Sequence, residues 1–305
     1  MAIANVARRE SLHPAPVFRA LVTNLVDYAG LFPPAGLTMP EAVRNYDVYL
    51  KGEMNWMLGR FIVPASRLRE LELATSEIEP DRKWRLSCIV GDDPRAGLRE
   101  VESFNDRNSG VRASVDTIEV HLPDVELCQD LLPHVSKNLT TYVEVPLNTP
   151  TDLLRSLGKS GARAKIRTGG LIPSAIPSTR AIAGFLANCA AADTEFKATA
   201  GLHHPLRSLK PLTYKPDAPR TKMHGFLNLF LAAAFARHGA SAADVTGVMD
   251  CEEAQCFSFE ENEARWNDLA MTTNAIHKTR QQFAMSFGSC SFEEPVEDLR
   301  HLHLL

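Results

Sequence analysis

Short strand-like segments alternate with helix-like segments along the chain from Leu58 onward. Each strand-like segment is rich in branched or aromatic residues, and the stretch after it carries apolar residues at helical spacing. One strand per unit gives eight expected strands, near residues 60, 87, 119, 143, 166, 198, 257 and 285. Eight such units in about 250 residues match the size of a (β/α)8 barrel. A doubly wound open sheet is the competing architecture, and polar residues that recur on the inward side of many strands favour the barrel.

The start of the chain is expected to be helical. Two helices are predicted around residues 16–27 and 40–51, so residues 1–56 form an N-terminal helical extension over one barrel mouth, and residues 57–305 form the barrel. The segment 205–221 is broken by prolines and has no helical period. A connection of this length inside a compact domain is typical of a lid or a substrate loop.

Composition favours a globular protein that acts on a small molecule. The chain has 305 residues, of which 45% are hydrophobic and 23% charged, and its net charge of −4 does not favour a nucleic-acid partner. The N-terminus has no apolar run like that of a secretory signal, and the longest apolar run, 226–236, is too short to cross a bilayer. Six scattered cysteines without a C-x-x-C motif predict reduced thiols. We therefore expect a cytoplasmic protein without membrane contact, with a homo-oligomer left open.

Two lysines stand inside predicted strands. Lys165 lies in A-K-I-R-T-G-G and Lys197 in F-K-A-T-A-G, 32 positions later. That separation is one strand–helix step, so the two lysines are expected on adjacent parallel strands. A lysine is costly to bury unless it has a partner, and two neighbouring ones indicate a functional site. These lysines are the main reason to predict an enzyme.

Alternation along each strand predicts which side chains face the barrel interior. In 164–168 the apolar residues occupy one parity, which leaves the charged residues inward, and the same argument applies to the other strands. Barrel enzymes keep their chemistry at the carboxyl ends of the strands. The alternative is a non-catalytic subunit whose inward charges form a closed network of ion pairs. The expected inward polar residues are Arg60, Glu119, His121, Tyr142, Glu144, Lys165, Arg167 and Lys197.

These residue types predict carbonyl chemistry. A lysine with cationic neighbours and apolar walls has a lowered pKa, and its free amine can add to an aldehyde or ketone to form an imine. In this hypothesis Arg167 and one lysine lower the pKa of the other lysine, while a nearby carboxylate or phenol carries protons. The predicted catalytic residues are Lys165, Lys197, Glu144, Glu119, Arg167 and Tyr142.

Residues that follow the strands are candidates for substrate binding. The Thr168–Gly170 turn can hold an anion, and small residues after the last strand stand where barrels often bind phosphate. For Asp27 and Tyr28, a helix end explains the sequence better than contact with substrate, and for Cys290 burial is favoured over a nucleophilic role. The predicted substrate-binding residues are Arg60, Thr168, Gly169, Gly170, His203, His204, His224, Asn228, Ser286 and Gly288.

A metal centre is the alternative chemistry. Glutamates and histidines are suitable ligands for Zn²⁺ or Mn²⁺, which would make the protein a metal-dependent lyase or hydrolase on the same barrel. The leading hypothesis needs no cofactor. The alternative ligands are Glu119, His121, Glu144, His203 and His204.

The two lysine strands also carry a resemblance. K-I-R-T-G-G followed one strand later by F-K-A-T-A-G resembles the paired-lysine strands of class I (Schiff-base) aldolases, such as deoxyribose-phosphate aldolase. The resemblance implies that Lys165 forms the imine and Lys197 tunes it, in a carbon–carbon lyase that acts on a small oxygenated carbonyl substrate. It covers about 40 residues and departs at Arg167, where the family prefers a small residue, and at 201–204, where it prefers a glycine-rich phosphate turn.

Overall fold

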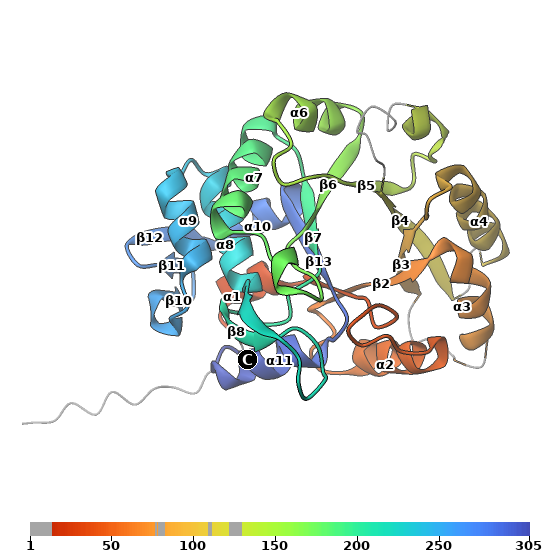
Figure 1. The fold of residues 1–305 in the computed structure, drawn as a ribbon, viewed down its shortest axis with the longest axis horizontal. Helices are drawn as coiled ribbons and strands as arrows, with labels where there is room; N and C mark the ends of the chain where they lie inside the picture. The colour runs from red at the N-terminus through yellow and green to blue at the C-terminus, as the bar shows by residue number, and fades with distance from the viewer. Residues whose placement is uncertain (1–13, 77, 79–82, 109–111, 122–129) are drawn as a thin grey trace, which may run out of the picture.

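Eight parallel strands close into a barrel, as predicted (Figure 1). The computed structural model describes residues 14–76, 78, 83–108, 112–121 and 130–305. Around the barrel the strands follow the order β1-β13-β7-β6-β5-β4-β3-β2, and every neighbouring pair is parallel. The barrel strands are β1 (Val26–Tyr28), β2 (Leu58–Pro64), β3 (Trp84–Ile89), β4 (Ala113–His121), β5 (Thr140–Glu144), β6 (Ala162–Arg167), β7 (Phe196–Thr199) and β13 (Ala284–Ser289).

Helices surround the barrel (Figure 1). Several begin where the sequence supplies a cap: the Asp93 side chain accepts a hydrogen bond from the Ala96 amide, and Ser178 does the same for Ala181. No helix of the described segments combines the length and apolar character needed to cross a bilayer. The helices are α1 (Pro16–Val22), α2 (Met39–Lys51), α3 (Leu68–Ala74), α4 (Pro94–Arg107), α6 (Thr151–Lys159), α7 (Thr179–Ala192), α8 (Phe226–Arg237), α9 (Ala242–Asp250), α10 (Thr273–Gln282) and α11 (Glu293–His301).

The structure corrects one expected strand of the barrel and adds one that was expected to be helical. β1 is a barrel strand between β13 and β2, so residues 14–56 supply a strand to the barrel and do not form a helical cover alone. The segment near residue 257 is outside the barrel, because β10 (Phe257–Phe259) pairs with β11 (Glu263–Trp266), which pairs with β12 (Leu269–Thr272). A local antiparallel partner across a tight turn satisfies the hydrogen bonds of β10 without the barrel.

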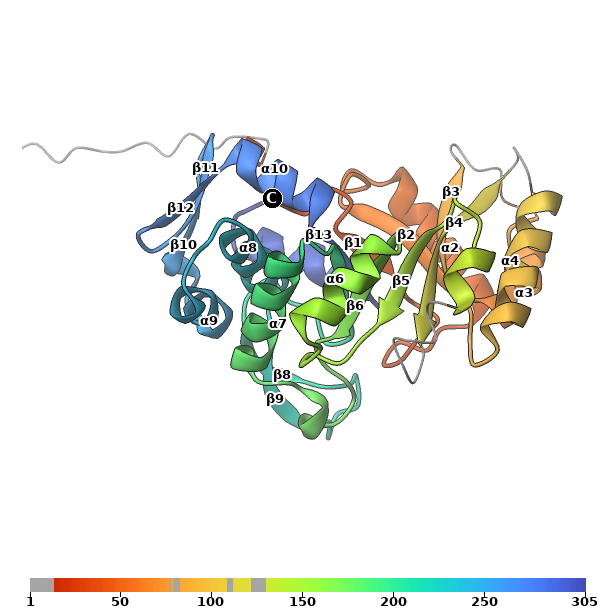
Figure 2. The same ribbon diagram turned by 90° about the horizontal axis from the view of Figure 1, so that it is seen from above.

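The proline-broken segment forms a hairpin beside the barrel mouth. β8 (Ser208–Pro211) and β9 (Arg220–Met223) pair antiparallel and project on the side toward which the arrows of β5 and β6 point (Figure 2). The hairpin therefore lies on the same side of the barrel as the carboxyl ends of its strands.

Alternation along the strands separates an apolar layer from a polar interior. Ala164 and Ile166 of β6 are fully buried against the surrounding helices, as the parity argument predicts. The alternate residues of the same strand, Lys165 and Arg167, point to the opposite face. The interior at the carboxyl ends of the strands is consequently built from charged side chains.

The loops after β6 and β7 touch each other through glycines. A Cβ on Gly169 would lie 2.8 Å from the Cα of Gly201, which itself has a φ of +75°.

We expect Gly169→Ala to lower the free energy of unfolding by about 1–3 kcal/mol, because backbone must move to admit the methyl group. Gly184→Ala in α7 is the matched control, since a Cβ there meets no heavy atom within 4 Å. Helix propensity predicts a gain of about 1 kcal/mol for it. Urea unfolding measures both, and equal stability of the two variants would contradict the packing argument.

Candidate functional site

A cavity of about 640 Å³ opens at the carboxyl ends of the barrel strands. Its wall includes residues from the ends of most strands, which is where the fold places catalytic groups in barrel enzymes. Among them are Ala29, Glu119, Glu144, Lys165, Thr199 and Gly288.

Lys165 reaches this cavity from β6 between two carboxylates. Its Nζ lies 2.7 Å from Oε2 of Glu119 and 3.1 Å from Oε2 of Glu144. Glu144 is the register partner of Lys165 on β5, so neighbouring strands place the two groups together. The Lys165 side chain is 7% exposed and lines the cavity. A cavity-facing amine with two adjacent proton acceptors is the central feature of the site.

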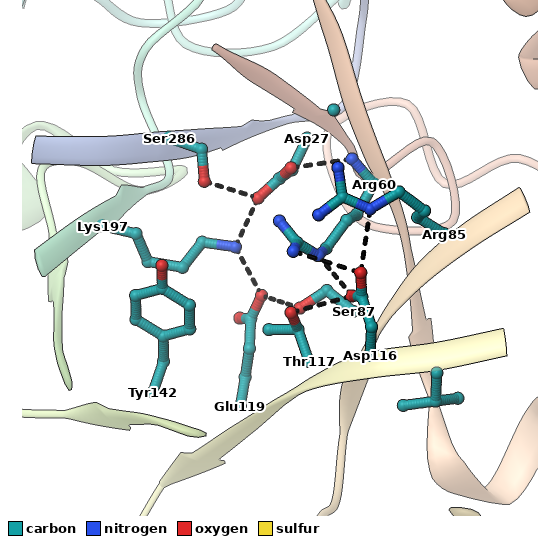
Figure 3. A network of polar contacts seen from close by, with 12 residues as sticks. Asp27, Arg60, Arg85, Ser87, Asp116, Thr117, Glu119, Tyr142, Lys197 and Ser286 are labelled. Atoms are coloured by element: carbon teal, nitrogen blue, oxygen red, sulfur yellow. Dashed lines mark hydrogen bonds and ion pairs between the residues drawn. The ribbon is translucent and has the colours of Figure 1, made fainter. Parts of the chain in front are cut away.

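Lys197 is buried more deeply than Lys165 and does not line the cavity. It is the register partner of Lys165 on β7. Its Nζ lies 2.7 Å from Oδ2 of Asp27 and 2.7 Å from Oε1 of Glu119, and its side chain is 1% exposed (Figure 3). Glu119 therefore gives one carboxylate oxygen to each lysine.

The charges in this network hold each other in their ionised forms. Burial by itself would raise the pKa of Glu119, but Lys165 and Lys197 outweigh it and hold that pKa well below its usual range. Burial would lower the pKa of Lys197, but Asp27 and Glu119 outweigh it and raise that pKa. The prediction of a lowered lysine pKa is thus wrong for Lys197, because carboxylates and not cations surround its ammonium group.

Asp27 is the residue that sequence reasoning placed incorrectly. It is the central residue of β1 and 1% exposed, and it is not part of a helix end. Its Oδ1 accepts a hydrogen bond from the Arg60 amide at 2.8 Å, and its Oδ2 accepts one from Ser286 Oγ at 2.7 Å (Figure 3). The one available signal was an acid between two buried apolar residues, Val26 and Tyr28.

The predicted catalytic residues divide between the cavity and the layer below it. Glu119, Glu144 and Arg167 line the cavity with Lys165. Tyr142 is buried beside Lys197, whose Nζ lies 5.3 Å from the centre of its ring. Burial raises the pKa of Tyr142 despite the opposing effect of Arg163. Tyr142 is not part of the cavity wall, and its role as a proton carrier stays a prediction.

Three of the predicted substrate-binding residues, Gly170, His203 and Gly288, line the cavity. The others do not, because their polar groups hold other parts of the fold. Arg60 pairs with Asp116 at 2.5 Å, Thr168 donates to the Ala200 carbonyl, and Ser286 donates to Asp27. The remaining residues outside the cavity wall are Gly169, which packs against Gly201; His204, which borders a separate cavity of about 220 Å³; His224, which contacts the Pro177 carbonyl; and Asn228, which donates to the Val248 and Cys251 carbonyls.

Four of the proposed metal ligands, Glu119, His121, Glu144 and His203, line the cavity, but each contacts other partners. His203 Nδ1 lies 3.0 Å from Glu294, His204 Nδ1 lies 2.6 Å from Asp298, and the exposed His121 lies 3.6 Å from Glu144. Over the described ranges, no group of three or more histidine, cysteine or acidic side chains is placed to hold a metal ion. The zinc or manganese alternative therefore has no ligand set in this part of the chain.

His203, which follows β7, brings a further charge to the cavity wall. Burial lowers its pKa, but hydrogen bonds with Cys290 and Glu294 outweigh burial and raise the pKa to about 9. The Cys290 Sγ lies 4.0 Å and the Glu294 carboxylate 3.0 Å from Nδ1 of His203. His203 is consequently an imidazolium at neutral pH.

Comparison with known proteins adds no name to this geometry: the chain matches no protein-family model, and no curated protein is significantly similar to it. The fold is one that commonly carries enzymes, with their active sites at the mouth that holds this cavity.

The buried ion pairs predict the effect of removing Lys197. Lys197→Met leaves Asp27 without its ammonium partner and Glu119 with only Lys165, so we expect the free energy of unfolding at pH 7 to fall by about 3–5 kcal/mol. Lys222→Met is the matched control, since Lys222 is 54% exposed and pairs with Glu252 at the surface. Its expected loss is below about 1 kcal/mol. Urea unfolding of both variants makes the comparison, and losses of similar size would show that the buried network contributes no more than a surface pair.

The raised pKa of His203 predicts how stability depends on pH. A group whose pKa is raised in the folded state stabilises the fold fully below its unfolded value, near 6.5, and loses that contribution as the pH rises through about 9. We expect wild type to exceed His203→Gln in stability by about 3 kcal/mol at pH 6, and this difference to shrink by pH 10.

His204→Gln serves as the control for this measurement. Burial lowers the pKa of His204 despite its contact with Asp298, so its charge does not change between pH 7 and 10. The stability difference for that variant should stay constant over this range in urea unfolding. A constant difference for His203→Gln as well would rule out the charged pair.

Proposed function

We propose that this protein is a carbon–carbon lyase of the class I aldolase type, which binds a small oxygenated carbonyl substrate covalently through Lys165. The observation that carries the proposal is the position of Lys165. Lys165 lines the cavity at the carboxyl ends of the strands, and its Nζ contacts the carboxylates of Glu119 and Glu144. An amine that forms an imine needs access to the substrate and a nearby group that accepts and returns protons.

Formation of the imine uses Lys165 and Glu144. The ammonium group of Lys165 gives one proton to the Glu144 carboxylate. The free amine adds to the carbonyl carbon, and one of its protons moves to the carbonyl oxygen, which becomes a hydroxyl group. The hydroxyl of the resulting carbinolamine takes the proton back from Glu144 and leaves as water. The nitrogen then carries the positive charge of an iminium ion, which withdraws electrons from the neighbouring carbon.

Cleavage uses the same carboxylate. Glu144 takes the proton of the substrate hydroxyl at the β carbon, the bond between the α and β carbons breaks, and its electron pair forms an enamine as an aldehyde departs. The α carbon then recovers the proton from Glu144. Water hydrolyses the iminium ion and releases the second carbonyl product and Lys165. The sequence is redox-neutral and needs no other reactant.

Lys197, which is buried beneath the cavity wall, supplies a fixed positive charge. Lys197 stays protonated between Asp27 and Glu119, and Glu119 thereby keeps one oxygen on Lys197 and one on Lys165. This arrangement orients the Lys165 amine from below and leaves Glu144 as the carboxylate free to exchange protons. Lys197 is in this view a positioning residue.

The open cavity favours an enzyme over a non-catalytic subunit. A barrel whose charges serve stability alone is expected to have a closed mouth with each charge paired. Here about 640 Å³ of space reaches Lys165, Glu144 and Arg167. This volume is in the usual range for small-molecule sites.

Reductive trapping tests the proposal. We expect sodium cyanoborohydride with dihydroxyacetone, glycolaldehyde or acetone to leave a covalent adduct, and peptide mass mapping to place it on Lys165. Lys165→Arg should give no adduct, while Lys222→Arg at the surface should leave trapping unchanged. Absence of an adduct at Lys165 with all three probes, or equal labelling of surface lysines, would overturn the proposal.

A further inference from the structure

Arg167 occupies the wall of the cavity next to Lys165. It lies two residues beyond Lys165 on the same strand, so both side chains point to the same face of β6. The strand rise separates their Cα atoms by about 6.6 Å. Arg167 is exposed and lines the cavity at the carboxyl end of the strand. Its guanidinium group is therefore available to a molecule that reaches Lys165.

The other cations of this wall already have acidic partners. Lys165 contacts Glu119 and Glu144, and His203 contacts Glu294. Within the described part of the chain, the side chain of Arg167 makes no ion pair or hydrogen bond. The cavity thus holds one positive charge that the fold itself does not neutralise.

The strand beside Arg167 ends in an unusual backbone. Thr199 is the register partner of Arg167 on β7, and the next two residues, Ala200 and Gly201, have φ values of +62° and +75°. An alanine rarely adopts a positive φ, and such strain is concentrated at binding and catalytic sites. All three residues line the same cavity, so the uncompensated guanidinium stands beside a strained turn and a threonine.

We propose that Arg167 binds a carboxylate of the substrate, so that the substrates of this enzyme are short oxo acids. This inference rests on the proposed function of Lys165. A guanidinium group presents two parallel N–H donors that match the two oxygens of one carboxylate. The reacting carbonyl carbon lies at Lys165, and the carboxylate lies one side-chain spacing further along β6. A phosphate is the less favoured anion, because the described wall offers it one guanidinium group and no second unpaired cation.

A matched pair of probes isolates the carboxylate. 4-Oxopentanoate and its methyl ester carry the same ketone and differ in charge, so the ratio of their trapping rates on Lys165 reports recognition of the carboxylate. We expect wild type to favour the acid, and Arg167→Met to reduce this ratio by about tenfold to a hundredfold. Arg99→Met is the control, because Arg99 is exposed on α4 outside the cavity. It should keep the wild-type ratio.

Further outcomes separate this inference from the function that it extends. Trapping of acid and ester at equal rates in wild type, or a ratio unaffected by Arg167→Met, would overturn the carboxylate site while leaving the imine lysine in place. The trapping rates of dihydroxyacetone phosphate and dihydroxyacetone give a second ratio, which reports recognition of phosphate. If this ratio exceeds that of the acid to its ester, the assignment to carboxylate is overturned. Calorimetric binding of 4-oxopentanoate without reductant, lost in Arg167→Met and kept in Arg99→Met, supports the site even if no imine is trapped.

Discussion

The carboxylate of Glu119 is the interaction on which the centre of this barrel depends. It lies between two ammonium groups, with Oε2 on Lys165 and Oε1 on Lys197. A hydroxyl hydrogen bond from Ser87 satisfies Oε1 further. Without this anion, two lysines on neighbouring strands would face each other inside a protein, and at least one would have to lose its proton or leave the interior. The alternation of charge allows both lysines to remain buried and protonated.

Burial divides the network into a sealed part and an open part. Asp27 and Lys197 are almost completely enclosed, and Glu119 connects them to the cavity wall. A buried charge keeps its ionised state because every change of charge would leave a partner unpaired. Lys165 and Glu144 stand one layer nearer the mouth, where the cavity supplies water or substrate. In the proposed function, the enclosed charges would hold Lys165 in place, which is the preorganisation that enzymes use around a nucleophile. Lys165 and Glu144 would then be the groups that exchange protons and bonds with the substrate.

Much of the barrel could be predicted from the sequence, but one barrel strand was missed and one predicted strand lies outside the barrel. The spacing of Lys165 and Lys197 predicted adjacent strands, and the register confirms them as direct partners. β1 is three residues long, too short to show an alternating pattern, so it was taken for the end of a helix. β10 does show a strand pattern, but a local partner holds it in a separate sheet. Periodicity identifies strands, and the choice of partner depends on contacts that a single sequence does not reveal.

The site shows the same division between residue types and their contacts. The inward charged residues of β4 to β7 followed from parity, because side-chain direction in a strand is a local property. The sign of the electrostatic effect did not, since it depends on which charges touch: Lys197 meets Asp27 and Glu119, and no cation. Asp27 belongs to a strand that was not recognised, so the partner that explains the charge of Lys197 was missing from the prediction. An inward lysine on a strand is therefore evidence for a site. Its protonation state, however, depends on all the charged groups that contact it. For Lys197 these include Asp27, which is far away in the sequence.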